Sequence, residues 1–68
     1  MAIVQLNRIK TVLTECGKSN LWLAERLNKN AATVSRWCTN DNQPSVETLY
    51  QIALPLDVDI RELLNKTK

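Results

Sequence analysis

Apolar residues recur every three or four positions along five stretches of the chain, which is the spacing of one face of an α-helix. The first stretch predicts a helix from about Ile3 to Glu15. Gly17 is well placed to end this helix, because glycine readily adopts the left-handed backbone of a helix terminus. The apolar stripe comprises Leu6, Ile9, Val12, Leu13 and Cys16.

The second and third stripes lie close together between residues 19 and 38. Ser19 is a good N-cap for one helix and Asn30 for the next. Between them, Asn28 falls where a residue with positive φ would end the first of the pair, a conformation that asparagine tolerates well. We therefore expect a tight turn between two helices. Their inward residues are Leu23, Ala24 and Leu27 on the first, and Val34, Trp37 and Cys38 on the second.

The last two stripes follow a polar loop, TNDNQP, at residues 39–44. Ser45 is expected to cap a fourth helix, which Pro55 stops or kinks. Asp59 and Glu62 form an acidic capping pair that opens a fifth helix. The inward residues are Val46, Leu49, Ile52 and Ala53, followed by Ile60, Leu63 and Leu64. The whole pattern predicts an all-α fold of five helices in a single domain, residues 1–68.

The composition is typical of a soluble globular domain, with 44% apolar and 24% charged residues. No apolar run approaches the roughly 20 residues that cross a bilayer, so no membrane association is expected and the cytoplasm is the expected location. A chain of 68 residues leaves little room for an enclosed pocket. We therefore expect neither a cofactor nor a small-molecule ligand.

Histidine is absent, and Cys16 and Cys38 are the two cysteines. A tetrahedral zinc site needs four nitrogen or sulfur ligands, so these residue types cannot supply a metal site within one copy of the chain. The thiols are interpreted as buried, reduced and apolar in character, with a redox or disulfide role as the alternative. No acid, base and nucleophile can be assembled from this sequence, so an enzyme is not expected.

The net charge of +2 is unevenly distributed along the chain. Residues 1–36 hold six lysines and arginines against two glutamates, a balance of +4, whereas residues 37–68 hold three against five carboxylates, a balance of −2. The basic N-terminal half favours a polyanionic partner that binds to one face of the molecule.

Residues 20–37, NLWLAERLNKNAATVSRW, and residues 44–64, PSVETLYQIALPLDVDIRELL, resemble the helix-turn-helix domain of the phage Cro and lambda-repressor class, the XRE-type regulators. The resemblance covers roughly residues 6–64. Its most specific parts are Ala24, Val34 and Trp37 around the turn and the run PS-x-ETL-x-x-IA at residues 44–53. It implies a compact lambda-repressor-like fold, in which the helix after the turn enters the major groove of DNA.

Several places depart from the pattern of this family, among them Lys29, where members often have an apolar residue, and Pro55, where the fourth helix would usually continue. Asn28 and Asn40 stand where members usually have glycine, at the turn and in the loop after the recognition helix. Leu13 and Cys38 stand where many members bury an arginine against a glutamate. An apolar pair can replace such an ion pair without loss of stability.

The base-reading residues are expected on the side of the third helix turned away from the core. Arg36 is the only charged residue there, so it is the first choice for a bidentate contact to guanine, while a phosphate contact or simple exposure is the alternative. Because most residues on this side of the helix are small, they offer few contacts to the bases, and we expect DNA shape and water to supplement direct readout. The candidate set is Ala31, Ala32, Thr33, Ser35 and Arg36.

Phosphate contacts are expected on both sides of this helix. By resemblance, Asn20 occupies the phosphate-binding position at the start of the second helix, where backbone N–H groups are free. Asp41 opposes tight binding unless its carboxylate is turned away, and Lys29 is either a phosphate contact or a solubilising charge. The candidate set is Lys18, Ser19, Asn20, Lys29, Asn30, Thr39, Asn40, Asn42 and Gln43.

Trp22 lies almost opposite the inward stripe of its helix, next to Leu21. The pair is interpreted either as a partner-binding surface or as a ring folded over neighbouring aliphatic groups and the stem of Arg26.

One module of this kind buries only about 600–1,000 Å² on DNA, so a two-fold homodimer on half-sites is expected. The C-terminal part offers more apolar residues than one short helix needs, namely Leu54, Leu56, Val58 and Ile60. The sequence thus predicts a small regulator that binds double-stranded DNA in a bacterial nucleoid or in a phage-derived setting. The alternative is an antitoxin-like protein-interaction module on the same scaffold, using Leu21 and Trp22.

Overall fold

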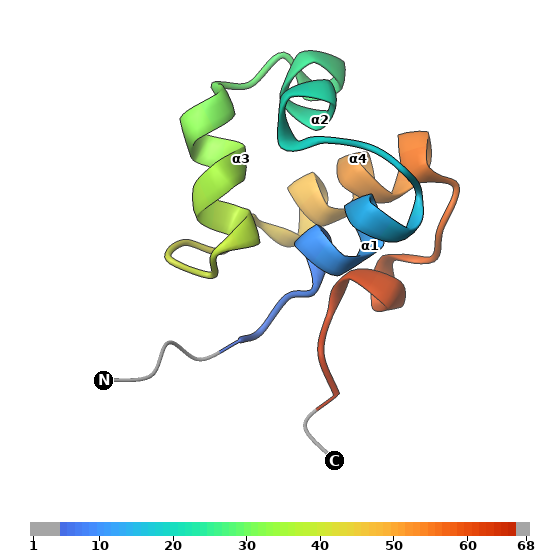
Figure 1. The fold of residues 1–68 in the computed structure, drawn as a ribbon. Coiled ribbons are helices and arrows are strands. Elements are labelled where there is room, and N and C mark those ends of the chain that lie inside the picture. The colour runs from blue at the N-terminus through green and yellow to red at the C-terminus, as the bar shows by residue number, and fades with distance from the viewer. Residues whose placement is uncertain (1–4, 67–68) are drawn as a thin grey trace.

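The computed structural model describes residues 5–66, which form four α-helices and one short 3₁₀ helix (Figure 1). The α-helices are α1 (Ile9–Glu15), α2 (Asn20–Leu27), α3 (Ala31–Cys38) and α4 (Val46–Leu56), and the 3₁₀ helix η1 spans Ile60–Leu63. The all-α class is confirmed. The fifth predicted helix is a single 3₁₀ turn, capped as expected by Asp59, whose carboxylate accepts the N–H of Arg61 at 2.8 Å.

The predicted helix starts are confirmed by their capping hydrogen bonds. Ser19 Oγ accepts the N–H of Trp22 at 3.1 Å, Asn30 Oδ1 accepts that of Ala32 at 2.7 Å, and Ser45 Oγ accepts that of Thr48 at 3.1 Å. Each cap satisfies one of the N–H groups that a helix leaves without a partner in its first turn. The polar residues between the apolar stripes therefore set where α2, α3 and α4 begin.

The first helix begins at Ile9, later than the apolar pattern indicates, and the predicted start at Ile3 lies outside the described residues. Asn7 Oδ1 accepts the N–H of Ile9, and the N–H groups of Leu6 and Asn7 both donate to Asn40 Oδ1 at 2.9 Å. These backbone groups have partners outside a helix, so the segment stays extended. Leu6 and Ile9 have helical spacing in the sequence, but the residues between them do not form a helical turn.

Four burial predictions are also wrong, and one of them is Leu6, which is 48% exposed on the segment before α1. Cys16 is exposed rather than buried, because α1 ends at Glu15 and Gly17 turns the chain away with φ 70°. Val46 is exposed, since the inward face of α4 starts only at Leu49, and Leu64 is exposed after the last turn.

Pro55 does not stop α4, which continues to Leu56. A proline in the final turn removes a single helical hydrogen bond, and the helix ends at Asp57, which has φ 55°. The N–H groups of Asp57 and Val58 then close the terminus on the carbonyls of Leu54 and Ala53.

One hydrophobic core joins all five elements. Ala24, 2% exposed, lies in α2 within this core, where the methyl group is small enough for two helices to pack closely. Within residues 5–66, no helix combines the length and apolar character needed to cross a membrane. The core residues are Ile9, Val12, Leu13, Leu23, Ala24, Val34, Trp37, Leu49, Ile52, Ala53, Leu56 and Leu63.

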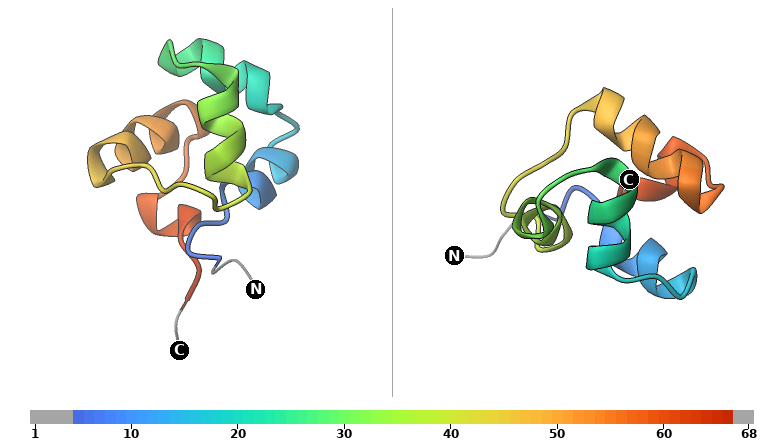
Figure 2. Two further views of the ribbon diagram at one scale, coloured as in Figure 1. Left: turned by 90° about the vertical axis from the view of Figure 1, so that its left-hand side faces the viewer. Right: turned by 90° about the horizontal axis from the view of Figure 1, so that it is seen from above.

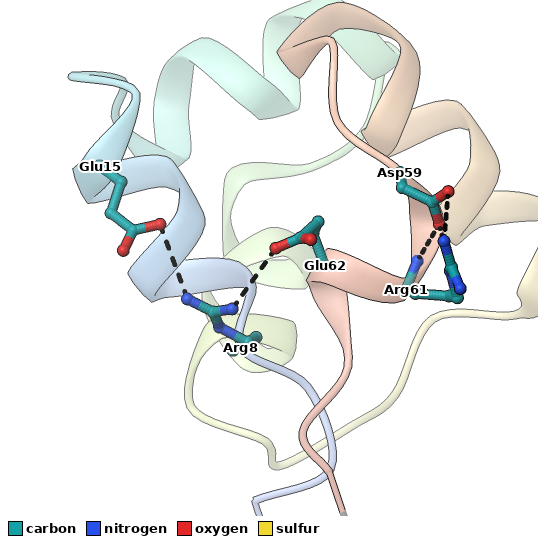
Figure 3. A network of polar contacts seen from close by, with 5 residues as sticks. All are labelled: Arg8, Glu15, Asp59, Arg61 and Glu62. Atoms are coloured by element: carbon teal, nitrogen blue, oxygen red, sulfur yellow. Dashed lines mark hydrogen bonds and ion pairs between the residues drawn. The ribbon is translucent and has the colours of Figure 1, made fainter.

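The two ends of the described chain lie side by side (Figure 1). Asn7 and Leu64 form an antiparallel bridge, and the N–H of Arg8 donates to the carbonyl of Leu63 at 2.9 Å. The Arg8 guanidinium also lies between two carboxylates, 3.6 Å from Glu15 and 3.7 Å from Glu62 (Figure 3). The start of α1 is therefore held against η1.

Candidate nucleic-acid interface

The outer side of α3 is open to solvent. Val34 and Trp37 are buried and Cys38 is half-buried, as the apolar spacing predicts. The five candidate base-reading residues lie on the remaining surface of the helix: Ala31, Ala32, Ser35 and Arg36 are exposed, and Thr33 is half-buried. Figure 2 shows α3 at the surface of the molecule rather than between other helices.

Arg36 is available for an external contact. Within residues 5–66, its guanidinium takes part in no hydrogen bond or ion pair, whereas its carbonyl accepts the N–H groups of Asp41 and Asn42. The loop after α3 thus folds back onto the end of the helix and leaves the Arg36 side chain free.

The turn between α2 and α3 aims this surface outward. Asn28 has φ 55°, the left-handed conformation expected of it, and the N–H of Lys29 closes the turn on the carbonyl of Ala24 at 2.9 Å. Asn30 then caps α3 within two residues. Because the connection is so short, the direction of α3 is fixed by the packing of α2 in the core.

The N-terminus of α2 brings together Lys18, Ser19 and Asn20. Lys18 and Ser19 are exposed, and the Ser19 hydroxyl oxygen is used as the helix cap. Asn20 is half-buried, and its Oδ1 accepts a hydrogen bond from the thiol of Cys38 at 3.3 Å. No hydrogen bond within the described part of the chain engages its Nδ2 group, which can therefore donate to an external acceptor.

The thiol of Cys38 is a proton donor at neutral pH. Burial raises the pKa of this thiol above its usual value of 9.0, and the positive charge of Lys10 offsets only part of the increase. The thiol therefore remains protonated near pH 7. Cys38 was predicted to be buried and reduced; its thiol is free but only half-buried, and it has a polar contact that the sequence did not indicate.

The loop after α3 requires a correction. Asn40 was expected to contact phosphate, but it is buried, 7% exposed, and its side chain is occupied inside the protein. Oδ1 accepts the N–H groups of Leu6 and Asn7, and Nδ2 donates to the carbonyl of Asn7 at 3.2 Å. With φ 64°, Asn40 adopts the backbone conformation for which related sequences use glycine. It anchors the loop and is not a candidate for binding phosphate.

Gln43 belongs to the same internal network. Its Oε1 accepts from Asn7 Nδ2 at 2.8 Å, and its Nε2 donates to Asn40 Oδ1 at 3.1 Å. A phosphate contact by Gln43 would have to replace these bonds. Asn42 is exposed and, within residues 5–66, its side chain has no hydrogen-bond partner.

Asp41 and Thr39 interact with each other at the end of α3. The Thr39 hydroxyl lies 3.1 Å from Asp41 Oδ2 and 3.2 Å from the carbonyl of Arg36. The carboxylate thus has a local donor, but a neutral hydroxyl does not cancel its charge, so Asp41 still opposes a phosphate close to the end of α3. Thr39 itself is exposed, so its hydroxyl can exchange these internal acceptors for an external one.

Trp22 is half-buried against the core and holds two cations on its ring. Lys18 Nζ lies 4.9 Å and the Arg26 guanidinium carbon 5.6 Å from the ring centroid, both within range of cation–π attraction. This agrees with a ring folded over its neighbours and the Arg26 side chain. The contact with Lys18 was not predicted, because the two residues are separated by the start of the helix.

The ion pairs of the described residues gather away from α2 and α3. Arg8 is paired with two glutamates and Arg61 with Asp59, at the edge formed by α1 and η1 (Figure 3). Four cations on or beside α2 and α3 have no carboxylate within ion-pair distance in residues 5–66. These cations are Lys18, Arg26, Lys29 and Arg36. Residues 18–41 hold these four cations against Glu25 and Asp41, so this part of the chain has a net charge of +2.

The comparisons with known proteins agree with this geometry. A family model for helix-turn-helix proteins matches residues 9–63. Among solved structures, the chain is similar to the crystal structure of a proposed DNA-binding protein from Bacteroides fragilis, with 52% sequence identity and a TM-score of 0.87. That alignment covers 88% of this chain and 97% of the other. Comparison with curated proteins gives no match.

Proposed function

The chain belongs to the XRE-type helix-turn-helix family, and from this premise we propose that it is a small, non-enzymatic regulator that binds specific sequences in double-stranded DNA. The observation that carries the proposal is the exposed outer side of α3, where Arg36, which has no ion pair within residues 5–66, lies among small residues. An α-helix fits the major groove, and an arginine can donate two hydrogen bonds to the edge of guanine. Ala32 and Thr33 can contact a thymine methyl group.

Phosphate contacts are proposed to orient α3 in the groove. Asn20 and Lys18 lie at the N-terminus of α2, where two backbone N–H groups and the helix dipole favour an anion. Lys29, Asn30, Thr39 and Asn42 are the exposed candidates on the turn and the loop. Occupancy of an operator by the protein then blocks or recruits polymerase.

Selection of bound duplexes from a random pool tests this proposal. Wild-type protein should recover a defined motif with an affinity that falls steeply with salt. Arg36→Ala should cost about 1–3 kcal/mol of binding free energy and relax one position of the motif. Arg61→Ala removes the same side chain from η1 and should leave the motif unchanged. A motif and affinity unaffected by Arg36→Ala would contradict the assignment.

A two-fold dimer is proposed to supply the remaining specificity. The predicted C-terminal surface is largely unavailable, because Leu56 is buried and Val58 and Ile60 pack against the core. Instead, α4 exposes an apolar stripe of Val46, Tyr50 and Leu54, four residues apart. Glu47 is the one charged residue on this helix, so the stripe has little charge to oppose a second copy. Figure 2 shows α4 at the side of α3, which leaves the outer side of α3 accessible.

Light scattering with and without the selected duplex tests the dimer. Wild-type protein should bind as two chains per site, and Tyr50→Glu should reduce this to one chain with weaker binding. Leu64→Glu is the control, because Leu64 is also exposed (43%) and lies beside Asn7, outside the proposed DNA contacts and the α4 stripe. A wild-type mass of one chain in the presence of the duplex, or equal effects of the two substitutions, would exclude α4 as the dimer surface.

A further inference from the structure

Asn20 and Cys38 connect the first residue of α2 to the last residue of α3. They are 18 positions apart in sequence, and Cys38 Sγ lies 3.3 Å from Asn20 Oδ1. Among residues 5–66, this is the one hydrogen bond between a side chain of α2 and a side chain of α3. Both residues are half-buried, so the contact lies at the margin of the core.

The chemistry of the pair determines how the carboxamide is oriented. A thiol is a weak donor and a weak acceptor, and here the Cys38 thiol donates to the amide oxygen of Asn20, so Oδ1 is the branch of the carboxamide that lies against Cys38. The carboxamide is planar, and its Nδ2 group is on the branch opposite to Oδ1. When Oδ1 is held by the thiol, the two N–H donors of Nδ2 face away from Cys38, and no acceptor within the described chain takes them.

We infer that Cys38 is a positioning residue for DNA binding: its thiol fixes the Asn20 carboxamide with the amide donors directed toward a backbone phosphate. This inference rests on the proposed function, since it assigns an orienting partner to one of the phosphate contacts. A freely rotating asparagine would present its oxygen to the phosphate in half of its orientations, and that approach is repulsive. When the Asn20 carboxamide is held with its N–H donors toward the phosphate, the binding affinity is not reduced by these unproductive orientations.

The effect requires a protonated side chain at position 38. Burial keeps the thiol in this form at neutral pH, as described above. Serine can replace the donor with a hydroxyl, whereas alanine removes it with a minimal change of volume. The two substitutions therefore separate the hydrogen bond from the packing of the Cys38 side chain.

A double-mutant cycle on duplex binding tests the inference. The proteins are wild type, Cys38→Ala, Asn20→Ala and the double variant, measured against the selected duplex and against a mixed-sequence duplex. Cys38→Ala should weaken both affinities by up to about twofold, because the released carboxamide still presents its donors to the phosphate in half of its orientations. The double variant should bind no more weakly than Asn20→Ala alone, and Cys38→Ser should restore most of the loss.

A structural role of Cys38 alone would give a different result. Additive losses in the double variant, an unchanged affinity of Cys38→Ala, or a failure of Cys38→Ser to restore binding would each overturn the inference while leaving the proposed function intact. Thermal denaturation of every variant identifies a temperature at which all are folded, and binding is measured there. Absence of salt-dependent duplex binding by the wild-type protein would overturn the proposed function, and the inference with it.

Discussion

Replacement of Asn40 by alanine is the sharpest test of how the loop after α3 is held. The side chain is 7% exposed, and its Oδ1 accepts the N–H groups of Leu6 and Asn7, both at 2.9 Å. The residue also has φ 64°, a conformation that alanine adopts less readily than asparagine. Asn40→Ala therefore removes an internal acceptor and introduces backbone strain at the same position.

The loss of stability caused by Asn40→Ala can be worked out from the groups that lose a hydrogen-bond partner. Leu6 is exposed, so water can replace the acceptor for its N–H. Asn7 is 2% exposed, and a buried N–H without a partner costs about 1–3 kcal/mol. Alanine at positive φ adds about 1 kcal/mol relative to asparagine. The sum, about 2–4 kcal/mol, is large for a chain of this size, whose core rarely supplies more than about 3–5 kcal/mol.

Urea denaturation followed by tryptophan fluorescence measures this loss, since Trp37 lies in the core. Asn28→Ala is the matched control: Asn28 has φ 55°, is exposed, and has no side-chain hydrogen bond within residues 5–66. Asn28→Ala should lower the free energy of unfolding only by the cost of placing alanine at positive φ, about 1 kcal/mol. Asn40→Gly should be more stable than Asn40→Ala by that cost and no more, because glycine accepts positive φ but also lacks the asparagine side chain. An Asn40→Ala loss equal to that of Asn28→Ala would refute the anchoring role of the side chain.

Three further predictions follow from the fold and the interface. Ala24→Leu should destabilise the protein by about 1–3 kcal/mol in urea denaturation, because Ala24 is 2% exposed and the larger side chain overpacks the core; unchanged stability would show that the site can expand. Lys29→Ala should reduce the slope of log affinity against log salt by about 1 without changing the selected motif, and an unchanged slope would make Lys29 a solubilising charge. The backbone N–H and then the guanidinium of Arg61 lower the pKa of Asp59, so the stability that this carboxylate contributes is complete above its usual pKa of 3.8 and is lost as pH falls through the lowered value. The stability of Asp59→Asn should therefore fall less than that of the wild-type protein as the pH is lowered through this range. Identical dependence of stability on pH in the two proteins would contradict the prediction.

Local sequence signals predicted α2, α3 and α4 well. Ser19, Asn30 and Ser45 cap the helices through bonds to residues two or three positions ahead, so the capping chemistry is visible in a short window of sequence. Asn28 likewise acts on its own turn. The outer surface of α3 could be predicted for the same reason, because helical periodicity that places Trp37 inward leaves Arg36 outward.

The errors have long-range causes. The start of α1 depends on Asn40, more than 30 residues away in the chain, and no local pattern reveals that its side chain binds the N–H groups of Leu6 and Asn7. The same bonds remove Asn40 from the phosphate-binding candidates. The contact between Asn20 and Cys38 was also missed, since it forms only when α2 and α3 cross. Local chemistry therefore identified the helices, while tertiary partners decided which polar residues remain free.

The pairing of the two chain ends has a consequence for biosynthesis. Asn65 donates from Nδ2 to the carbonyl of Gln5 at 2.7 Å, and its N–H donates to the carbonyl of Leu6 at 2.9 Å. On the ribosome, the turn between α2 and α3 can form before residues 63–65, which secure the start of α1, have been synthesised. Contacts of such wide sequence separation form late and slowly. Before residues 63–65 have docked, α3 therefore lies on a scaffold whose first helix is not yet secured, and the surface of α3 reaches its final setting only once these residues have paired with residues 5–8.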